Sequence, residues 1–183
     1  NEGVIASVEE VADIRTCPTL DNVDVWLTHA AEPPARWLRT SGCMGGMTVE
    51  KPEQANHIPQ RDEKFEPSQL VDLFRRFSAS ADLHHQAGGL HASALSDGQQ
   101  ILALAEDIGR HNTLAKIAGK LLLDRIEAQQ RLILTSGRIS SEMIQKSARL
   151  RAEMVISRTA PTSTAVNLAR AWGITLIGYA RGD

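Results

Sequence analysis

A hairpin signature at residues 91–105 decides the fold of this chain. Two strand-like runs, His91-Ala-Ser-Ala-Leu95 and Ile101-Leu-Ala-Leu-Ala105, flank Ser96-Asp97-Gly98. An Asp-Gly pair is typical of a tight turn between strands, because both residues tolerate positive φ. The stretch therefore predicts two neighbouring antiparallel strands.

Helix-like and strand-like segments alternate after this hairpin. Apolar residues at helical spacing follow from Leu114 to Leu122, Ser140 or Ser141 caps a second expected helix, and a third starts at Pro161 and ends at Gly173. Buried strands are expected at 132–135, 154–156 and 174–179. This order predicts an α/β fold with three layers, α/β/α, around a mostly parallel mixed sheet in which the hairpin supplies one antiparallel pair.

The chain upstream of the hairpin divides near residue 67. Leu70, Leu73, Phe74 and Phe77 recur at helical spacing, whereas residues 1–66 are irregular and hold five of the seven prolines. We therefore expect a small irregular N-terminal part at 1–66 and an α/β domain at 67–183.

Composition narrows the function classes. The 183 residues carry a formal net charge of −2, which argues against a generally basic nucleic-acid binder. No apolar run approaches the roughly 20 residues of a membrane span, and no leader segment is visible. Two cysteines are too few for a disulfide framework and fit a reducing cytoplasm, where we expect the protein.

Arginine follows the predicted carboxyl end of each of four strands: Arg110, Arg138, Arg158 and Arg181. Ligands of such sheets bind beyond these ends, and helix N-termini together with forked guanidinium groups favour phosphate. Residues 131–183 also hold eight Lys/Arg against three Asp/Glu. The pattern favours a phosphate or nucleotide site; the alternative is that these arginines pair with surface carboxylates such as Glu106 and Asp107.

Cys43 is the candidate reactive residue. It lies in Ser41-Gly42-Cys43-Met44-Gly45-Gly46-Met47, where three glycines break regular structure and favour an accessible thiolate. An inert, buried thiol is the alternative. Cys17, beside Pro18, is interpreted as structural.

The element order also resembles the cytidine-deaminase-like fold. In deaminases a His/Cys-x-Glu opens the first core helix and Pro-Cys-x-x-Cys opens the next. His111 lies at the first ligand position, but Thr113 replaces the glutamate, and no cysteine occurs at 137–140. We therefore expect neither zinc nor deaminase chemistry.

Several motifs together resemble the FdhD/NarQ family of formate dehydrogenase accessory sulfurtransferases, and the resemblance runs in order over nearly the whole chain. The matching stretches are Gly88–Leu95, Glu106–Thr113, Ser136–Ser140, Ala160–Ser163 and Gly173–Tyr179. Glu2-Gly3-Val4-Ile5 resembles a motif that normally follows an N-terminal segment. We therefore expect this sequence to be truncated at its N-terminal end.

The resemblance implies a homodimeric sulfur carrier. Such proteins take persulfide sulfur from a cysteine desulfurase and deliver it to the molybdenum (or tungsten) bis(guanine dinucleotide) cofactor of formate dehydrogenase, which they also bind. Cys43 matches the first cysteine of the family's sulfur-carrying loop, and Gly46 stands at the second. The alternative is a chaperone that binds the cofactor without carrying sulfur.

The resemblance and the arginine loops together give the expected cofactor-binding residues. The family's cofactor-binding stretch maps onto Tyr179-Ala180-Arg181-Gly182, and the loops would hold pyrophosphate and guanine. The full set is Arg110, His111, Ser136, Gly137, Arg138, Thr159, Pro161, Thr162, Tyr179, Ala180, Arg181 and Gly182.

Overall fold

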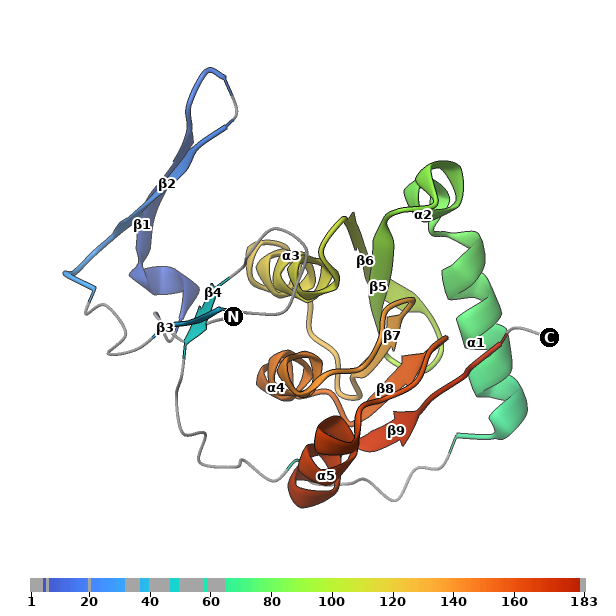
Figure 1. The fold of residues 1–183 in the computed structure, drawn as a ribbon. Coiled ribbons are helices and arrows are strands. Elements are labelled where there is room, and N and C mark those ends of the chain that lie inside the picture. Colours follow the sequence, from blue (N-terminus) through green and yellow to red (C-terminus); the bar gives the residue numbers. More distant parts are fainter. Residues whose placement is uncertain are drawn as a thin grey trace.

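The computed structural model describes residues 7–19, 21–31, 37–39, 47–49 and 65–181, together with Ile5 and Ile58. Figure 1 shows the arrangement of these parts. Two of the predicted site residues, Cys43 and Gly182, lie outside the described residues.

A five-stranded sheet forms the centre, in the order β6-β5-β7-β8-β9. The strands are β5 (His91–Ser96), β6 (Ile101–Asp107), β7 (Leu132–Thr135), β8 (Met154–Ser157) and β9 (Thr175–Ile177). β5 is antiparallel to both neighbours, and the other four strands share one direction. The expectation of one antiparallel pair was therefore wrong, because the almost fully buried β5 is an interior strand and pairs on both edges.

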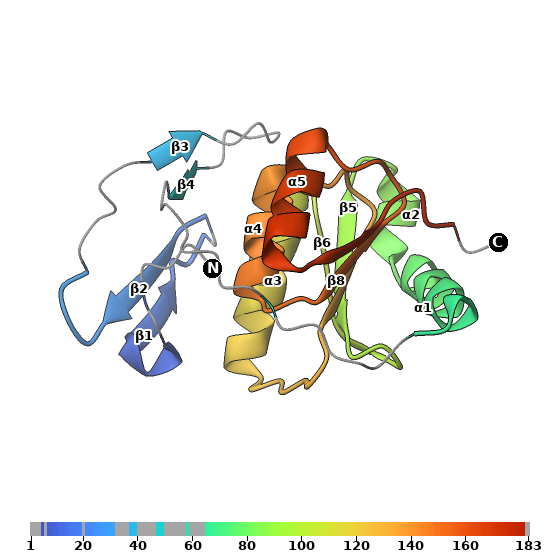
Figure 2. The ribbon, with the colours of Figure 1, turned by 90° about the horizontal axis from the view of Figure 1, so that it is seen from below.

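Helices cover both faces of the sheet (Figures 1 and 2). Leu114 of α3 (Arg110–Leu123), Met143 of α4 (Ser141–Arg149) and Ala165 of α5 (Ser163–Trp172) pack in one cluster with Ile133. On the other face, the helices are α1 (Pro67–Ala79) and the short α2 (Asp82–Ala87), which follows it. Phe74 and Phe77 of α1 pack against Leu132 and Leu134. Alternate residues of β7 thus enter opposite cores, as the period of a strand requires, and the predicted three-layer α/β/α fold is confirmed.

The N-terminal part forms two separate small sheets. After a 3₁₀ turn at Val8–Glu10, β1 (Val11–Thr16) pairs antiparallel with β2 (Val23–Leu27), and β3 (Trp37–Arg39) pairs with β4 (Met47–Val49). The β1–β2 hairpin stands apart from the central sheet in both views. Cys17 follows β1, and its thiol donates to Asp21 Oδ1 at 2.8 Å in the turn.

Two element ends differ from the sequence expectation. Pro161 does not start α5: it forms a bridge to Ile139, and the hydroxyl of Thr162 caps the helix by accepting from the Ala165 N–H. β9 ends at Ile177 and not at 179, because Tyr179 has a φ of 56° and the chain leaves the extended conformation there. None of the helices in the described part of the chain is long and apolar enough to cross a membrane.

Candidate functional site

Hydrogen bonds fasten the segments that follow the central strands to one another. The Ser157 hydroxyl donates to the Gly137 carbonyl oxygen at 2.7 Å. The Arg158 N–H donates to the Thr135 carbonyl oxygen at 3.2 Å, and the Ala180 N–H donates to that of Ser157 at 2.9 Å. The segments after β7, β8 and β9 therefore form one connected edge at the carboxyl ends of three parallel strands, where ligands bind in sheets of this kind.

A cavity of about 460 Å³ lies between α1 and this edge. Its size falls within the range of small-molecule sites. Three of its lining side chains are permanent cations, from α1, from the segment after β8 and from the segment after β9. The lining consists of Phe74, Arg75, Ser78, Arg158, Thr159, Ala180 and Arg181. We refer to it as the arginine cleft; its charge and its hydroxyl groups suit an anionic ligand.

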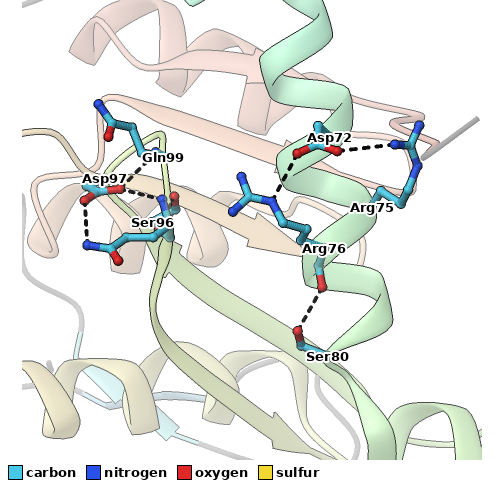
Figure 3. Close-up of polar contacts among 8 residues, drawn as sticks. Asp72, Arg75, Arg76, Ser80, Ser96, Asp97 and Gln99 are labelled. Atoms are coloured by element: carbon cyan, nitrogen blue, oxygen red, sulfur yellow. Dashed lines mark hydrogen bonds and ion pairs between the residues drawn. The ribbon is translucent and has the colours of Figure 1, made fainter.

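α1 contributes to the arginine cleft because its apolar stripe faces the sheet. Phe74 is buried against the sheet, which places the adjacent Arg75 at the border between core and solvent. Asp72 lies between Arg75 and Arg76, 3.3 Å and 3.2 Å from their respective guanidinium nitrogens (Figure 3). Since both side chains of the Asp72–Arg75 pair are largely exposed, the pair orients Arg75 and contributes little to stability.

A smaller hollow of about 10 Å³ adjoins the arginine cleft and shares Phe74, Ser78 and Arg158 with it. His84, His85 and Ser136 complete its polar lining. The His85 Nε2 lies 2.6 Å from the Ser78 carbonyl oxygen. Ser136 Oγ accepts from the Ala92 N–H at 2.9 Å, which fixes the start of the β7–α4 segment on the α1 side of the sheet.

Arg110 and His111 lie on the other side of the same segment, at the start of α3. Both are buried, at 9% and 7% exposure. His111 Nε2 is 3.4 Å from Ser140 Oγ and 3.4 Å from Glu142 Oε2. Burial, with the Arg110 charge as the next cause, lowers the pKa of His111. The same two causes lower the pKa of half-buried His91, so both rings favour the neutral form.

The predicted site residues fall into several groups. Thr159, Ala180 and Arg181 line the arginine cleft, and Ser136 lines the hollow beside it. Arg110 and His111 lie at the start of α3, and Gly137 packs against Arg110 from the segment between β7 and α4. Arg138 and Tyr179 are exposed. Pro161 and Thr162 make backbone contacts with Ile139 that hold the β8–α5 segment.

Three cleft residues were not predicted as site residues: Phe74, which the sequence assigned only to the apolar face of a helix, Arg75 and Ser78. Arg75 and Ser78 come from α1, which follows no strand of the sheet, so the pattern of arginines after strand ends does not include them. The available signal was their position beside buried Phe74 on an amphipathic helix. In the part of the chain that the structure describes, no three His, Cys, Asp or Glu side chains are grouped to hold a metal ion.

The fold and the arginine cleft define a three-layer α/β protein with a positively charged edge. Comparison with known proteins gives the family: the sequence matches the FdhD/NarQ family over residues 1–183, and the chain belongs to it.

Named relatives agree with this assignment. A protein of Listeria monocytogenes named "Sulfur carrier protein FdhD" is 42% identical over 114 residues, which cover 62% of this chain and 44% of the Listeria protein. This chain thus spans less than half the length of that relative. The crystal structure of a putative formate dehydrogenase accessory protein from Desulfotalea psychrophila has a TM-score of 0.73 at 26% identity, covering 99% of this chain and 68% of that one. A guanine deaminase from Nitrosomonas europaea is a more distant likeness, with a TM-score of 0.45 at 13% identity over 69% of this chain and 83% of that one.

Proposed function

We propose that this chain is a sulfur carrier that serves a formate dehydrogenase and binds the guanine dinucleotide form of that enzyme's molybdenum or tungsten cofactor. The arginine cleft is the observation that supports cofactor binding, because Arg75, Arg158 and Arg181 surround a cavity whose volume suits a nucleotide. Family membership supports the proposed role as a sulfur carrier.

The arginine cleft suits the pyrophosphate of such a ligand. A guanidinium group offers two parallel N–H donors that match phosphate oxygens, and it keeps its charge at every physiological pH. Arg158 and Arg181 project from consecutive segments of the edge, and Ser78 and Thr159 add hydroxyl groups. Phe74 and Ala180 supply the apolar surface that a base requires.

Sulfur transfer is assigned to Cys43. Its thiolate attacks the terminal sulfur of a persulfide on a cysteine desulfurase, by the chemistry of thiol–disulfide exchange. A new S–S bond forms at Cys43, the donor S–S bond breaks, and the donor leaves as a thiolate. No external oxidant or reductant is required. We further propose that the protein is a cytoplasmic homodimer. The proposed sulfur transfer uses no zinc.

Binding of guanosine diphosphate, measured by calorimetry, tests the arginine cleft. Arg158→Gln should weaken binding at least about tenfold, because a charge-assisted phosphate contact is lost. Arg170→Gln is the matched control, since Arg170 is an exposed arginine in the last turn of α5. Equal affinities for wild type, Arg158→Gln and Arg170→Gln would remove the cleft from the proposal.

Intact mass after incubation with a cysteine desulfurase and cysteine tests the carrier. Wild type and Cys17→Ala should gain one reducible sulfur atom, and Cys43→Ala should gain none. Cys17→Ala is the matched control because Cys17 is the other cysteine of the chain. If wild type gains no sulfur while the desulfurase is active on another acceptor, the chaperone alternative is favoured.

A further inference from the structure

The N-terminus of α3 lacks the cap that the neighbouring helices have. Ser140 and Thr162 cap α4 and α5 with their hydroxyl groups. α3 has Gly109 at the N-cap and no acidic residue in its first turn. The N–H groups of Arg110 and His111 find no acceptor among the described residues. A helix start in this condition carries partial positive charge and two or more free donors.

The side chain of Arg110 adds a full charge at the same place. Only 9% of the residue is exposed, and its Nε has no hydrogen-bond partner within the described ranges. No carboxylate in those ranges forms an ion pair with it. A buried guanidinium whose Nε has no partner is costly, and an anion bound beside it would offset that cost.

The charges around Arg110 do not supply that anion. His91 and His111 favour the neutral form, and Arg138 and Lys146 add positive charge beside them. Glu142 opposes these charges from α4, 3.4 Å from His111 Nε2.

The carboxylate of Asp107, which precedes α3, is already occupied. It accepts from the Gly109 N–H at 2.8 Å and from Asn112 Nδ2 at 3.0 Å, and it lies 2.7 Å from Lys116 Nζ. The local balance therefore remains positive at the start of α3.

Gly137 fixes the position of Arg110 relative to the arginine cleft. A Cβ at Gly137 would lie 3.1 Å from Arg110 Cβ and 3.3 Å from His91 Nδ1, so the β7–α4 segment packs directly on these side chains. Ser136, one residue earlier, lines the hollow beside the arginine cleft. The Ser136–Gly137 peptide thus separates two positive regions.

We propose that the Arg110 guanidinium and the free N–H groups of Arg110 and His111 form a second oxyanion subsite, opposite the arginine cleft across Ser136–Gly137. The ligand of this edge then carries two phosphate-type groups, one for each side. The inference rests on the proposed nucleotide-binding function and deepens it. A ligand with a single anionic group would occupy either the arginine cleft or the second subsite, and not both.

Inorganic phosphate is the probe, and the NMR signals of the His91 and His111 rings report on the subsite. Phosphate should shift both signals in wild type and in Arg158→Gln, and it should raise the apparent pKa of both rings because it compensates the Arg110 charge. Arg110→Gln should weaken this response at least about tenfold. Arg110→Lys keeps the positive charge but loses the paired N–H donors of the guanidinium group, so its affinity for phosphate should be intermediate.

Thermal unfolding gives a second readout. Phosphate should raise the Tm of wild type by linkage, and this gain should disappear in Arg110→Gln. Arg110→Gln should melt at or above wild type without phosphate, since a buried charge whose Nε has no partner is removed. If phosphate leaves the histidine signals unmoved while guanosine diphosphate still binds, the subsite is overturned and the arginine cleft stands. If the histidines respond but guanosine diphosphate does not bind, the proposed function fails and the subsite stands.

Discussion

The Ser157 hydroxyl, fully buried at the end of β8, donates to the Gly137 carbonyl oxygen at 2.7 Å. This bond joins the segment that bears Arg158 to the segment that separates the arginine cleft from Arg110. The bond joins two residues that are 20 positions apart in sequence, and it therefore sets the relative placement of the two positive regions.

Ser157→Ala should lower the free energy of unfolding by about 1–3 kcal/mol, because the buried Gly137 carbonyl loses its donor. Urea denaturation checks this, with exposed Ser163→Ala on α5 as the control at near-wild-type stability. Affinity for guanosine diphosphate should fall in Ser157→Ala as well. Equal midpoints for the two variants would show that the bond does not fasten the edge.

Thr135→Val should also destabilise the edge. The Thr135 hydroxyl is buried, accepts from the Gly137 N–H at 3.2 Å and accepts from Ser93 Oγ at 3.0 Å. Valine keeps the shape but removes the acceptor, so two donors lose a partner, at a cost of about 1–3 kcal/mol. A denaturation midpoint equal to wild type would contradict this role of Thr135.

Two glycine substitutions should have opposite effects. Gly119→Ala in α3 places its Cβ in open space and should stabilise by about 0.5–1 kcal/mol through helix propensity. Gly137→Ala should destabilise, because its Cβ would lie 3.1 Å from Arg110 Cβ, an atom fixed close to the α3 backbone. The Tm of each variant, measured by calorimetry, checks these two predictions. A Tm of Gly137→Ala above that of wild type would mean that the β7–α4 segment moves freely away from α3.

Stability should fall as pH is lowered from about 8 to about 5. The pKa values of His91 and His111 are lowered in the folded state, chiefly by burial. The unfolded state therefore binds more protons near the ordinary histidine pKa of about 6.5, and the free energy of unfolding rises with pH through this range. A double variant, His91→Gln with His111→Gln, should show a flatter profile in denaturation series at fixed ionic strength; an unchanged slope would assign the dependence to other groups.

Local patterns in the sequence determined the secondary structure. The apolar run at 132–135 coincides with β7, the Asp-Gly turn joins β5 to β6, and Ser140 caps α4 as one of two predicted candidates. These features rest on spacing, turn chemistry and capping, which act over a few residues. The order of elements was enough for the three-layer fold, because alternating strands and helices have few ways to bury their apolar faces.

Only the tertiary structure decided how the predicted site residues are distributed. Arg158 and Arg181 line the arginine cleft, Arg110 is buried on the opposite side of Ser136–Gly137, and Arg75 joins the cleft from α1. The sequence placed arginines near the strand ends but did not assign each to a face of the sheet. That assignment depends on the interior position of β5 and on the packing of α1 and α3 against opposite faces, which are contacts between residues distant in sequence.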